Sequence, residues 1–494
     1  MERELESYGN VKIISDPKSH IPLYYIEEPE FSSDEKDIIN EPTSFISDYK
    51  LIAREISVIR SVQEKERFLR KVIKEHLEDK GIISKNRDEL INKIMDDLFF
   101  GYGILGPLMR DDNLEEIMVN GINEPIFVFH RKYGMCKTNL KYEDGKSIME
   151  FIDKTSHFVE RKIDTENPIL DGHLMDGSRI NISIPPAAPN GPSITIRKFR
   201  KSPFTIIDLI MKKTISIELS AFLWVCVEGF GIHPCNILIA GGSGAGKTTL
   251  LNALTMFIPE HERVITIEDT LELNFDFLKN HVSLEGIPSL SKENGEKITM
   301  EVLVENSLRM RPDRVIVGEV RGREAEPLFV AMDIGLNGSM GTIHSNNSKE
   351  TITRLVNKPM NVPLRMITLL NLIVVLNRYY DKEKGLCRRI TEVGEITGIE
   401  GNVAQIGEIY KWDNKTDRIK RTEYPILLKE DICKWCGLSK KELNREIFIR
   451  GKILEYMVKK GIRKREDIIP IFMEYHYNPQ SVIAKFRHDI ETQD

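Results

Sequence analysis

The stretch ILIAGGSGAGKTTLLNAL, residues 237–254, constrains the fold of this chain more than any other. An apolar strand leads into a glycine-rich loop with the spacing Gly-x4-Gly-Lys-Thr, and an amphipathic helix follows. In that context the backbone N–H groups of the loop can surround a phosphate, and the helix N-terminus adds the positive end of its dipole. A chance glycine-rich turn is the weaker interpretation, because strand, loop and helix agree. The residues expected to bind phosphate are Gly241, Gly242, Ser243, Gly244, Ala245, Gly246, Lys247, Thr248 and Thr249.

The segments around this loop predict a parallel sheet. Residues 216–380 alternate short apolar runs with helical patterns, which is typical of strands joined by crossover helices. Residues 387–420 alternate around turn sequences and predict antiparallel strands that finish the sheet. From Lys440 onward the pattern is helical. Ligands of such sheets lie at the carboxyl ends of the strands, so residues that follow the strands are candidates for the site.

Two of these strand ends carry acids. The segment RVITIEDTLEL offers Glu268, and RVIVGEV offers Glu319, which follows Gly318 where a nucleotide-hydrolysing site usually has an aspartate. With Lys247 on the β- and γ-phosphate oxygens and the Thr248 hydroxyl on Mg²⁺, one acid can hold the metal and the other can activate water. We favour Glu268 for the water and Glu319 for the metal, although the sequence does not separate these roles.

A histidine and several arginines complete the set of candidates. His344 ends the strand in GSMGTIHS, where it could sense the γ-phosphate or be merely structural. An arginine often compensates the charge that develops during phosphoryl transfer. The arginine candidates are Arg309, Arg311, Arg321 and Arg323 near the acids, and Arg179, Arg197 and Arg200 in the preceding domain.

Composition bounds the rest of the chain. The 494 residues are 41% hydrophobic and carry a net charge of −6, which argues against a general nucleic-acid binder. Residues 1–50 hold 5 basic and 12 acidic side chains, and predict an acidic, partly flexible arm.

No secretory signal is evident and the longest apolar runs are too short to span a bilayer, so we expect a cytoplasmic protein. Cys433 and Cys436 form an isolated CxxC pair, which predicts plain thiols rather than a metal or redox site.

Four boxes in one order carry a family resemblance. GGSGAGKTTLLNAL, VITIEDTLEL, LRMRPDRVIVGEVRGREA and GTIHSNN resemble the nucleotide-site boxes of the type II/IV secretion ATPases. The resemblance covers about residues 95–410 and extends upstream to GYGILGPLMRDDNLEEIMVNG. The C-terminal segment REIFIRGKILEYMVKKG resembles the archaeal branch, which drives pili, archaeal flagella or secretion. In that family a glycine precedes the second acid, as Gly318 does here. An asparagine, Asn337, stands where the family usually has an earlier histidine.

The resemblance implies a fold and a domain organisation. The fold class is α/β, with a RecA-like P-loop ATPase core whose mainly parallel sheet has helices on both faces, preceded by a PAS-like α+β domain and a small helical bundle. The expected domains are an acidic arm (1–50), a helical subdomain (51–110), an α+β sensor-like domain (111–202), a hinge linker (203–215), the ATPase domain (216–425) and a helical C-terminal subdomain (426–494).

The resemblance also implies a function. A homo-hexameric ATPase using ATP and Mg²⁺ would drive assembly or export of pilus-like filament subunits. It would act through a polytopic membrane platform protein, at the inner face of the membrane and without direct contact to nucleic acid. The implied catalytic residues are Glu268, Glu319, His344, Arg179 and Arg197, with Thr248 and Glu319 at the metal.

Two other classes compete with this motor enzyme. A ring-shaped nucleic-acid translocase would need basic or aromatic pore loops, and residues 216–380 show no such interleaving. A scaffold that binds nucleotide without turnover would not need Lys247, Glu268 and Glu319 together.

Overall fold

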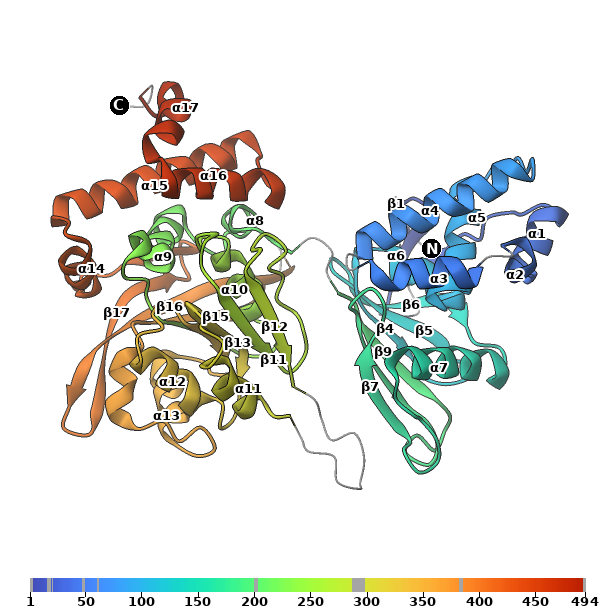
Figure 1. Ribbon diagram of the computed structural model, residues 1–494, viewed down its shortest axis with the longest axis horizontal. Coiled ribbons are helices and arrows are strands. Elements are labelled where there is room, and N and C mark those ends of the chain that lie inside the picture. The colour runs from blue at the N-terminus through green and yellow to red at the C-terminus, as the bar shows by residue number, and fades with distance from the viewer. Residues whose placement is uncertain are drawn as a thin grey trace. The chain divides into compact units, whose positions relative to one another are not determined.

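The computed structural model divides the chain into two compact units, Met1–Lys201 and Ser202–Asp494 (Figure 1). It describes residues 3–15, 19, 21–46, 49–59, 62–199, 203–286, 298–381 and 385–491. Within these ranges no helix has both the length and the apolar character needed to cross a lipid bilayer. Each unit is built around its own nine-stranded sheet.

The sheet of the first unit has nine strands in the order β1-β2-β3-β6-β5-β4-β9-β8-β7. They are β1 (Arg3–Tyr8), β2 (Val11–Ser15), β3 (Leu23–Ile26), β4 (Leu114–Val119), β5 (Pro125–His130), β6 (Gly134–Lys141), β7 (Ile169–His173), β8 (Arg179–Ser183) and β9 (Ser193–Arg197). Neighbouring strands are antiparallel except β3 and β6. Ile126 and Val128 of β5 are buried while their neighbours are partly exposed, as expected for a sheet with one covered face. Helix α7 (Gly145–Val159) contributes Ile148 and Ile152 to the same core.

Helices of the first unit form a second, smaller core. They are α1 (Ser33–Asn40), α2 (Pro42–Phe45), α3 (Tyr49–Val58), α4 (Val62–Asp79), α5 (Arg87–Ile94), the π-helical η1 (Met95–Phe100), the 3-10 turn η2 (Gly103–Leu105) and α6 (Gly106–Arg110). Leu69, Ile73 and Leu77 of α4 pack with Leu90 and Ile91 of α5. Their three- and four-residue spacing places them on one face of each helix. Helices α4 and α5 lie within residues 51–110, where a helical subdomain is expected.

The N-terminal stretch is structured rather than arm-like. Strands β1 to β3 pair with one another and extend the first sheet. Val11, Ile13 and Tyr24 are buried in its core, while the acids of β1 lie on an exposed edge strand. The Tyr24 hydroxyl donates a 2.5 Å hydrogen bond to Asp111. The expectation of an acidic arm relied on composition alone. Alternate apolar positions suffice to bury a strand even where the overall composition is acidic.

The sheet of the second unit has the strand order β12-β11-β13-β14-β10-β15-β16-β17-β18. The strands are β10 (Ile237–Gly241), β11 (Val264–Glu268), β12 (His281–Glu285), β13 (Arg314–Val320), β14 (Met340–Ile343), β15 (Leu372–Asp381), β16 (Gly385–Glu400), β17 (Val403–Asp413) and β18 (Arg418–Arg421). The first six strands in that order are parallel to one another. From β15 to β18 neighbouring strands are antiparallel, as the sequence predicts.

Both faces of this sheet are covered by helices. Ile237 and Ile239 of β10 belong to one apolar core, while Leu238 and Ala240 belong to another on the opposite face. A strand buried on both sides reads as a continuous apolar run, which is why these residues lack polar alternation. The helices and turns are α8 (Ile206–Met211), α9 (Ile217–Glu228), η3 (Gly229–Gly231), α10 (Lys247–Thr255), α11 (Met300–Ser307), α12 (Ala325–Asp333), α13 (Ser348–Val356) and η4 (Leu364–Leu369).

Four helices follow the sheet at the C-terminal end (Figure 1). They are α14 (Leu428–Cys436), α15 (Lys440–Lys460), α16 (Arg465–Tyr477) and α17 (Pro479–Glu491). Of these, α15 and α16 pack against α9. Glu228 at the end of α9 is buried, pairs with the Arg450 guanidinium of α15, and lies 2.6 Å from Nδ1 of His476 in α16. Arg314, the first residue of β13, donates a 2.6 Å hydrogen bond to the Val227 carbonyl. Buried charges of this kind persist only when paired, so these contacts fix the C-terminal helices to the sheet.

Two sequence expectations concern the borders of this core. The hinge linker expected at 203–215 contains α8, whose Ile206 and Ile207 are fully buried in the second unit. These residues therefore form part of the core rather than a free connection. Cys433 and Cys436 lie on α14, and Sγ of Cys436 lies 3.7 Å from the Gly229 carbonyl oxygen. Across the described part of the chain, no three His, Cys, Asp or Glu side chains are grouped so as to hold a metal.

Candidate nucleotide-binding site

The loop between β10 and α10 has the backbone that phosphate binding needs. Strand β10 ends at Gly241 and α10 begins at Lys247, so strand, loop and helix lie where the sequence predicts. Gly244 and Gly246 have φ of +67° and +98°, a region that residues with a Cβ atom rarely adopt. A Cβ atom at Gly241 would lie 2.7 Å from the Leu376 carbonyl oxygen of β15. The glycines therefore permit both the turn and its close packing on the neighbouring strand.

Lys247 connects this loop to the second acidic strand. Its side chain is largely buried, and its Nζ lies 3.5 Å from Oε1 of Glu319 and 3.4 Å from the Gly242 carbonyl oxygen. Strand β13, which carries Glu319, is separated from β10 by β14 alone. The three strands are parallel, so their carboxyl ends meet at the phosphate loop.

Glu319 is held ionised by two cations. The Arg321 guanidinium pairs with its Oε2, and Lys247 approaches its Oε1. Burial alone would raise the pKa of Glu319, but the Arg321 hydrogen bond and the Lys247 charge outweigh it and hold that pKa below its usual value. Arg321 also lies 3.5 Å from Oδ2 of Asp269. A carboxylate that stays ionised at neutral pH is suited to a cation-binding role.

Glu268 has the opposite electrostatic character. It is 2% exposed at the end of β11, and its Oε1 accepts backbone hydrogen bonds from Glu272 at 2.9 Å and Leu273 at 3.0 Å. Its Oε2 is buried with no hydrogen-bond partner among the described residues. Burial raises the pKa of Glu268 to about 7, although the two backbone hydrogen bonds act against that rise. A carboxyl group with a pKa near neutrality and one unused oxygen is suited to exchanging a proton with a bound water.

The glycine before Glu319 makes room for Glu268. A Cβ atom at Gly318 would lie 2.9 Å from Cγ of Glu268, closer than real Cβ contacts. The Thr342 hydroxyl of β14 donates a 2.6 Å hydrogen bond to the Gly318 carbonyl and so fixes this part of β13. An aspartate at position 318 would occupy the space of the Glu268 side chain. Gly318 is therefore a steric requirement of having a buried glutamate on the next strand.

Replacing Gly318 with alanine should destabilise the second unit by about 1–3 kcal/mol, because the added methyl group overpacks a closed core. The displaced Glu268 carboxylate should also lower any turnover. Urea denaturation and an ATPase assay measure the two effects. For the stability measurement alone, Gly242→Ala provides a matched control for a new methyl group, since the nearest atom to a Cβ there is 3.9 Å away. A Gly318→Ala variant as stable as wild type would contradict this packing argument.

The other strand-end candidates lie at the same edge of the sheet. His344 follows β14 directly, and the preceding Ile343 pairs with Ala240 of β10 and with Val320 of β13. The histidine is exposed, next to the ends of both strands. Asn337, the residue at the place of the family's earlier histidine, precedes β14 and therefore lies at its opposite end.

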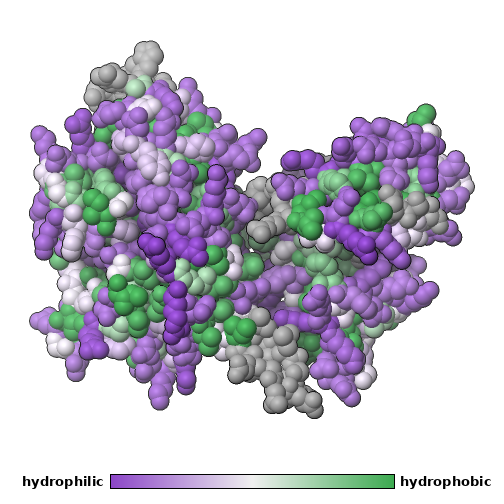
Figure 2. All heavy atoms as spheres, viewed as in Figure 1, coloured by the Kyte–Doolittle hydropathy of each residue, from purple (hydrophilic) through white to green (hydrophobic). Residues whose placement is uncertain are grey.

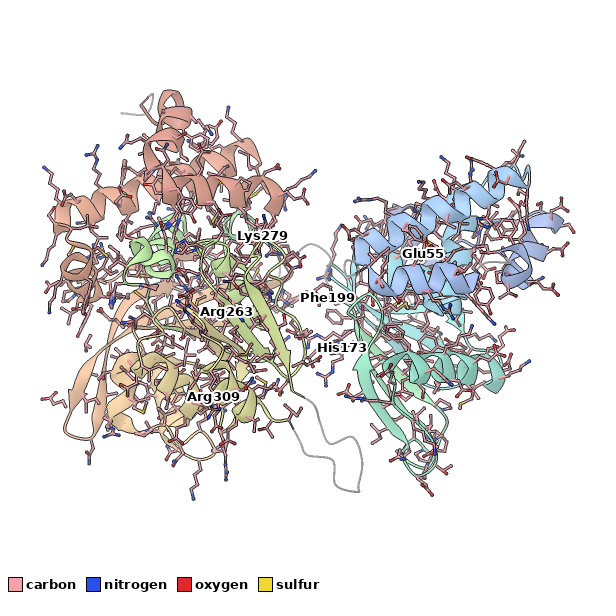
Figure 3. All side chains as sticks on the ribbon, in the orientation of Figure 1. Glu55, His173, Phe199, Arg263, Lys279 and Arg309 are labelled. Carbon is pink, nitrogen blue, oxygen red and sulfur yellow. The ribbon has the colours of Figure 1, made fainter. Side chains whose placement is uncertain are left out.

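The arginine candidates fall into three groups. Arg321 contacts both acidic strands, as described. Arg309, which is labelled in Figure 3, and Arg311 precede β13 and so lie at the amino edge of the sheet, opposite to Glu319. In the first unit, Arg179 and Arg197 are exposed partners on β8 and β9, and Arg179 pairs with Asp171 at 2.7 Å. Arg200 lies outside the described residues. A role for Arg179 and Arg197 at the nucleotide stays a prediction.

Sequence reasoning missed two arginines that lie against the phosphate loop. Nε of Arg388 in β16 donates a 3.0 Å hydrogen bond to the Gly244 carbonyl. Arg378 of β15 is the cross-strand partner of Arg388, and its guanidinium nitrogen lies 2.8 Å from the position a Cβ atom would take at Gly244. More than 130 residues separate them from the loop, so no local motif signals the contact.

The donor groups at this site fit Mg²⁺. The Thr248 hydroxyl lies in the first turn of α10, and Glu319 offers an ionised carboxylate on the adjoining strand end. Mg²⁺ prefers oxygen ligands and is usually held by one or two protein groups together with substrate phosphates.

A phosphate loop and two acids at the carboxyl edge of a mainly parallel, doubly covered sheet define a RecA-like P-loop ATPase core. The family model described as Type II/IV secretion system protein matches residues 101–447. The chain belongs to this family, and the resemblance seen in its four boxes is confirmed.

Relatives found by sequence agree with this assignment. An uncharacterized protein of Methanocaldococcus jannaschii, MJ0781, is 30% identical over an alignment 556 positions long, gaps included, which covers 78% of this chain and 77% of that protein. Protein VirB11 of Agrobacterium fabrum is 35% identical over 287 residues, covering 51% of this chain and 79% of that protein. The solved structure of the VirB11 ATPase from the Brucella suis type IV secretion system is 26% identical, covers 59% of this chain and 92% of that one, and has a TM-score of 0.30.

Proposed function

We propose that this chain hydrolyses ATP and couples that reaction to the assembly or export of pilus-like filament subunits. In this proposal it acts as a homo-hexamer at the inner face of the cell membrane, through a polytopic membrane platform protein. Membership of the type II/IV secretion family supports the coupling to a membrane machine. Relatives from Methanocaldococcus jannaschii support placing it in the archaeal branch of the family.

One observation carries the enzymatic part of the proposal. A lysine of the phosphate loop and two acids of opposite electrostatic character meet at one sheet edge: Lys247 and Glu319 in contact, and Glu268 buried with a free oxygen. A purely nucleotide-binding scaffold has no need of a proton acceptor with a pKa near 7.

The division of labour follows from these environments. Lys247 neutralises charge on the β- and γ-phosphate oxygens, and its release from Glu319 on binding frees Oε1 of that carboxylate. The Thr248 hydroxyl and Glu319 would hold Mg²⁺, which supplies charge neutralisation at the triphosphate. Glu268 orients the attacking water and accepts its proton. His344, which follows β14, contacts the γ-phosphate end.

Arg179 and Arg197 complete the proposed site as arginine fingers. They stand side by side on β8 and β9, so one movement of the first unit would carry both. Their arrival at the γ-phosphate, in the same subunit or a neighbouring one, would make closure depend on the nucleotide. We also propose that the finer division into a helical subdomain (51–110), an α+β domain (111–202), an ATPase domain (216–425) and a helical C-terminal subdomain (426–494) describes the moving parts.

The test of the enzymatic assignment is ATP turnover by the purified full-length chain, compared with Glu319→Gln. We expect turnover in the wild type and a loss of at least about ten-fold in the variant, because an amide holds Mg²⁺ less well than a carboxylate. Equal rates in the two proteins would sink the assignment. Purification from native membranes tests the partner, since an integral membrane protein should accompany the chain.

The raised pKa of Glu268 predicts an acid limb in the pH profile. A general base works only when deprotonated, so kcat/KM should rise with pH up to about 7 and level off above it. The profile of kcat/KM between pH 5 and pH 9 measures this limb. A limb centred near pH 4.5, the ordinary value for a glutamate, would contradict the role given to the buried carboxyl.

A further inference from the structure

The hairpin formed by β15 and β16 places two cations and two apolar side chains on one face. In its register Arg378 pairs with Arg388, and Tyr380 pairs with Leu386. Side chains two residues apart on a strand point to the same side, so these four form a single patch, here called the hairpin face. The residue between them, Tyr379, points to the other side and packs against Trp412.

The cationic half of the hairpin face lies against the phosphate loop. Arg388 donates its Nε hydrogen bond to the Gly244 carbonyl at 3.0 Å. A Cβ atom at Gly246 would lie 3.4 Å from Cδ of Arg388, and one at Gly244 would lie 2.8 Å from Nη1 of Arg378. Both guanidinium groups therefore border the turn whose N–H groups surround the phosphates.

The charges on this face suit an anionic ligand. Like charges directly opposite each other across two strands are destabilising. In the described parts of the chain neither Arg378 nor Arg388 forms an ion pair with a carboxylate. Arg389, on the other side of the same strand, is instead fully neutralised by both oxygens of Asp417 at 2.8 Å. Asp417 thus neutralises Arg389, whereas Arg378 and Arg388 are available to a ligand.

The apolar half lies farther along the same face and remains open. Tyr380 is 75% exposed and Leu386 is 45% exposed. Hydrophilic side chains cover most of the surface of the second unit seen in Figure 2, with apolar side chains in small groups among them. An aromatic ring beside an aliphatic side chain, next to two guanidinium groups, suits a planar ring attached to a phosphate.

The strand order indicates which part of a bound nucleotide would lie next to the hairpin face. Glu268 and Glu319 lie on β11 and β13, on one side of β10, whereas β15 and β16 lie on its other side. The hydrolysed end of a triphosphate therefore points toward β13, and its nucleoside end toward the hairpin. Building on the proposed function, we propose that Arg378 and Arg388 bind the α-phosphate and that Tyr380 and Leu386 pack against the base.

Binding of ATP and of inorganic tripolyphosphate by the full-length chain tests this assignment. Tripolyphosphate fills the loop but has no base. Tyr380→Ala should weaken ATP binding by about ten-fold, the lower range for loss of one base–aromatic stack, and leave tripolyphosphate binding unchanged. The double variant Arg378→Gln/Arg388→Gln should weaken both ligands by about ten-fold or more, because both carry a third phosphate beside the loop.

Two controls and four outcomes make the test decisive. Tyr380→Phe keeps the ring and should bind ATP as wild type does, as should Val403→Ala, which removes an exposed apolar side chain elsewhere in the sheet. Failure of the wild type to bind ATP would overturn the proposed function itself. Normal ATP binding by Tyr380→Ala and by the double variant would overturn only the present inference. Equal weakening of ATP and tripolyphosphate binding by Tyr380→Ala would also overturn it. A changed oligomeric state with unchanged ATP affinity would do the same and would indicate a contact between copies of the chain.

Discussion

Replacing Glu268 with glutamine should lower the turnover of ATP by a factor of about 10²–10⁴ and change ATP affinity little. An amide has the shape of the carboxyl group but cannot accept the proton of the attacking water, and positioned bases contribute about this much to a reaction rate. Steady-state turnover and equilibrium nucleotide binding measure the two quantities separately. A variant that retains most of its turnover would assign the water to another residue and would reopen the division between Glu268 and Glu319.

The same variant should be more stable than the wild type at alkaline pH. The folded-state pKa of Glu268 is about 7, above its ordinary value of 4.5, so the folded protein binds this proton more tightly than the unfolded chain. The protonated carboxyl therefore stabilises the fold below pH 4.5, and that contribution is lost as pH rises to 7, by about 3 kcal/mol in all. Glutamine does not titrate, so the Tm advantage of Glu268→Gln should grow between pH 5 and pH 8. An advantage that stays constant with pH would mean that the carboxyl is not desolvated.

Replacing Lys247 with alanine should weaken ATP binding and lower kcat/KM by about 10²–10³. The lysine is the positive charge nearest the expected β- and γ-phosphates, and loss of one preorganised electrostatic group of this kind costs about that factor. Isothermal titration and steady-state kinetics measure the effect.

Lys349→Ala is a suitable control, because it removes an exposed lysine from α13 of the same unit. The variant Lys247→Ala also removes the partner of Glu319, so its thermal stability should be measured alongside binding. Full ATP affinity in Lys247→Ala would exclude a phosphate role for the loop lysine.

The sequence alone predicts the centre of the site and the sheet that carries it. The loop from Gly241 to Thr249 can be recognised in the sequence because every requirement of a phosphate loop is local: a strand, a glycine spacing and a helix. Glu268 and Glu319 could be found because parallel strands bring their ends together. The family follows from the same residues, since its boxes surround this one site.

Other features depend on packing between distant segments, and no pattern in the sequence reveals them. The fit of Glu268 over Gly318 joins two strands, and the approach of Arg388 to Gly244 joins residues 144 positions apart. The strands of residues 3–26 were missed because their acidic edge dominated the composition. The different pKa values of the two glutamates likewise arise from burial and neighbours, which sequence order does not encode.

The buried junction at Glu228 has a mechanical consequence. Arg450 and His476 attach the C-terminal helices to the end of α9, and Arg314 attaches that end to β13, the strand that carries Glu319. Separating these buried ion pairs would leave an unpaired charge and cost free energy. We therefore expect the C-terminal helices and the sheet to move as one rigid body. A partner bound to the C-terminal helices would therefore be displaced together with the sheet that carries the nucleotide site.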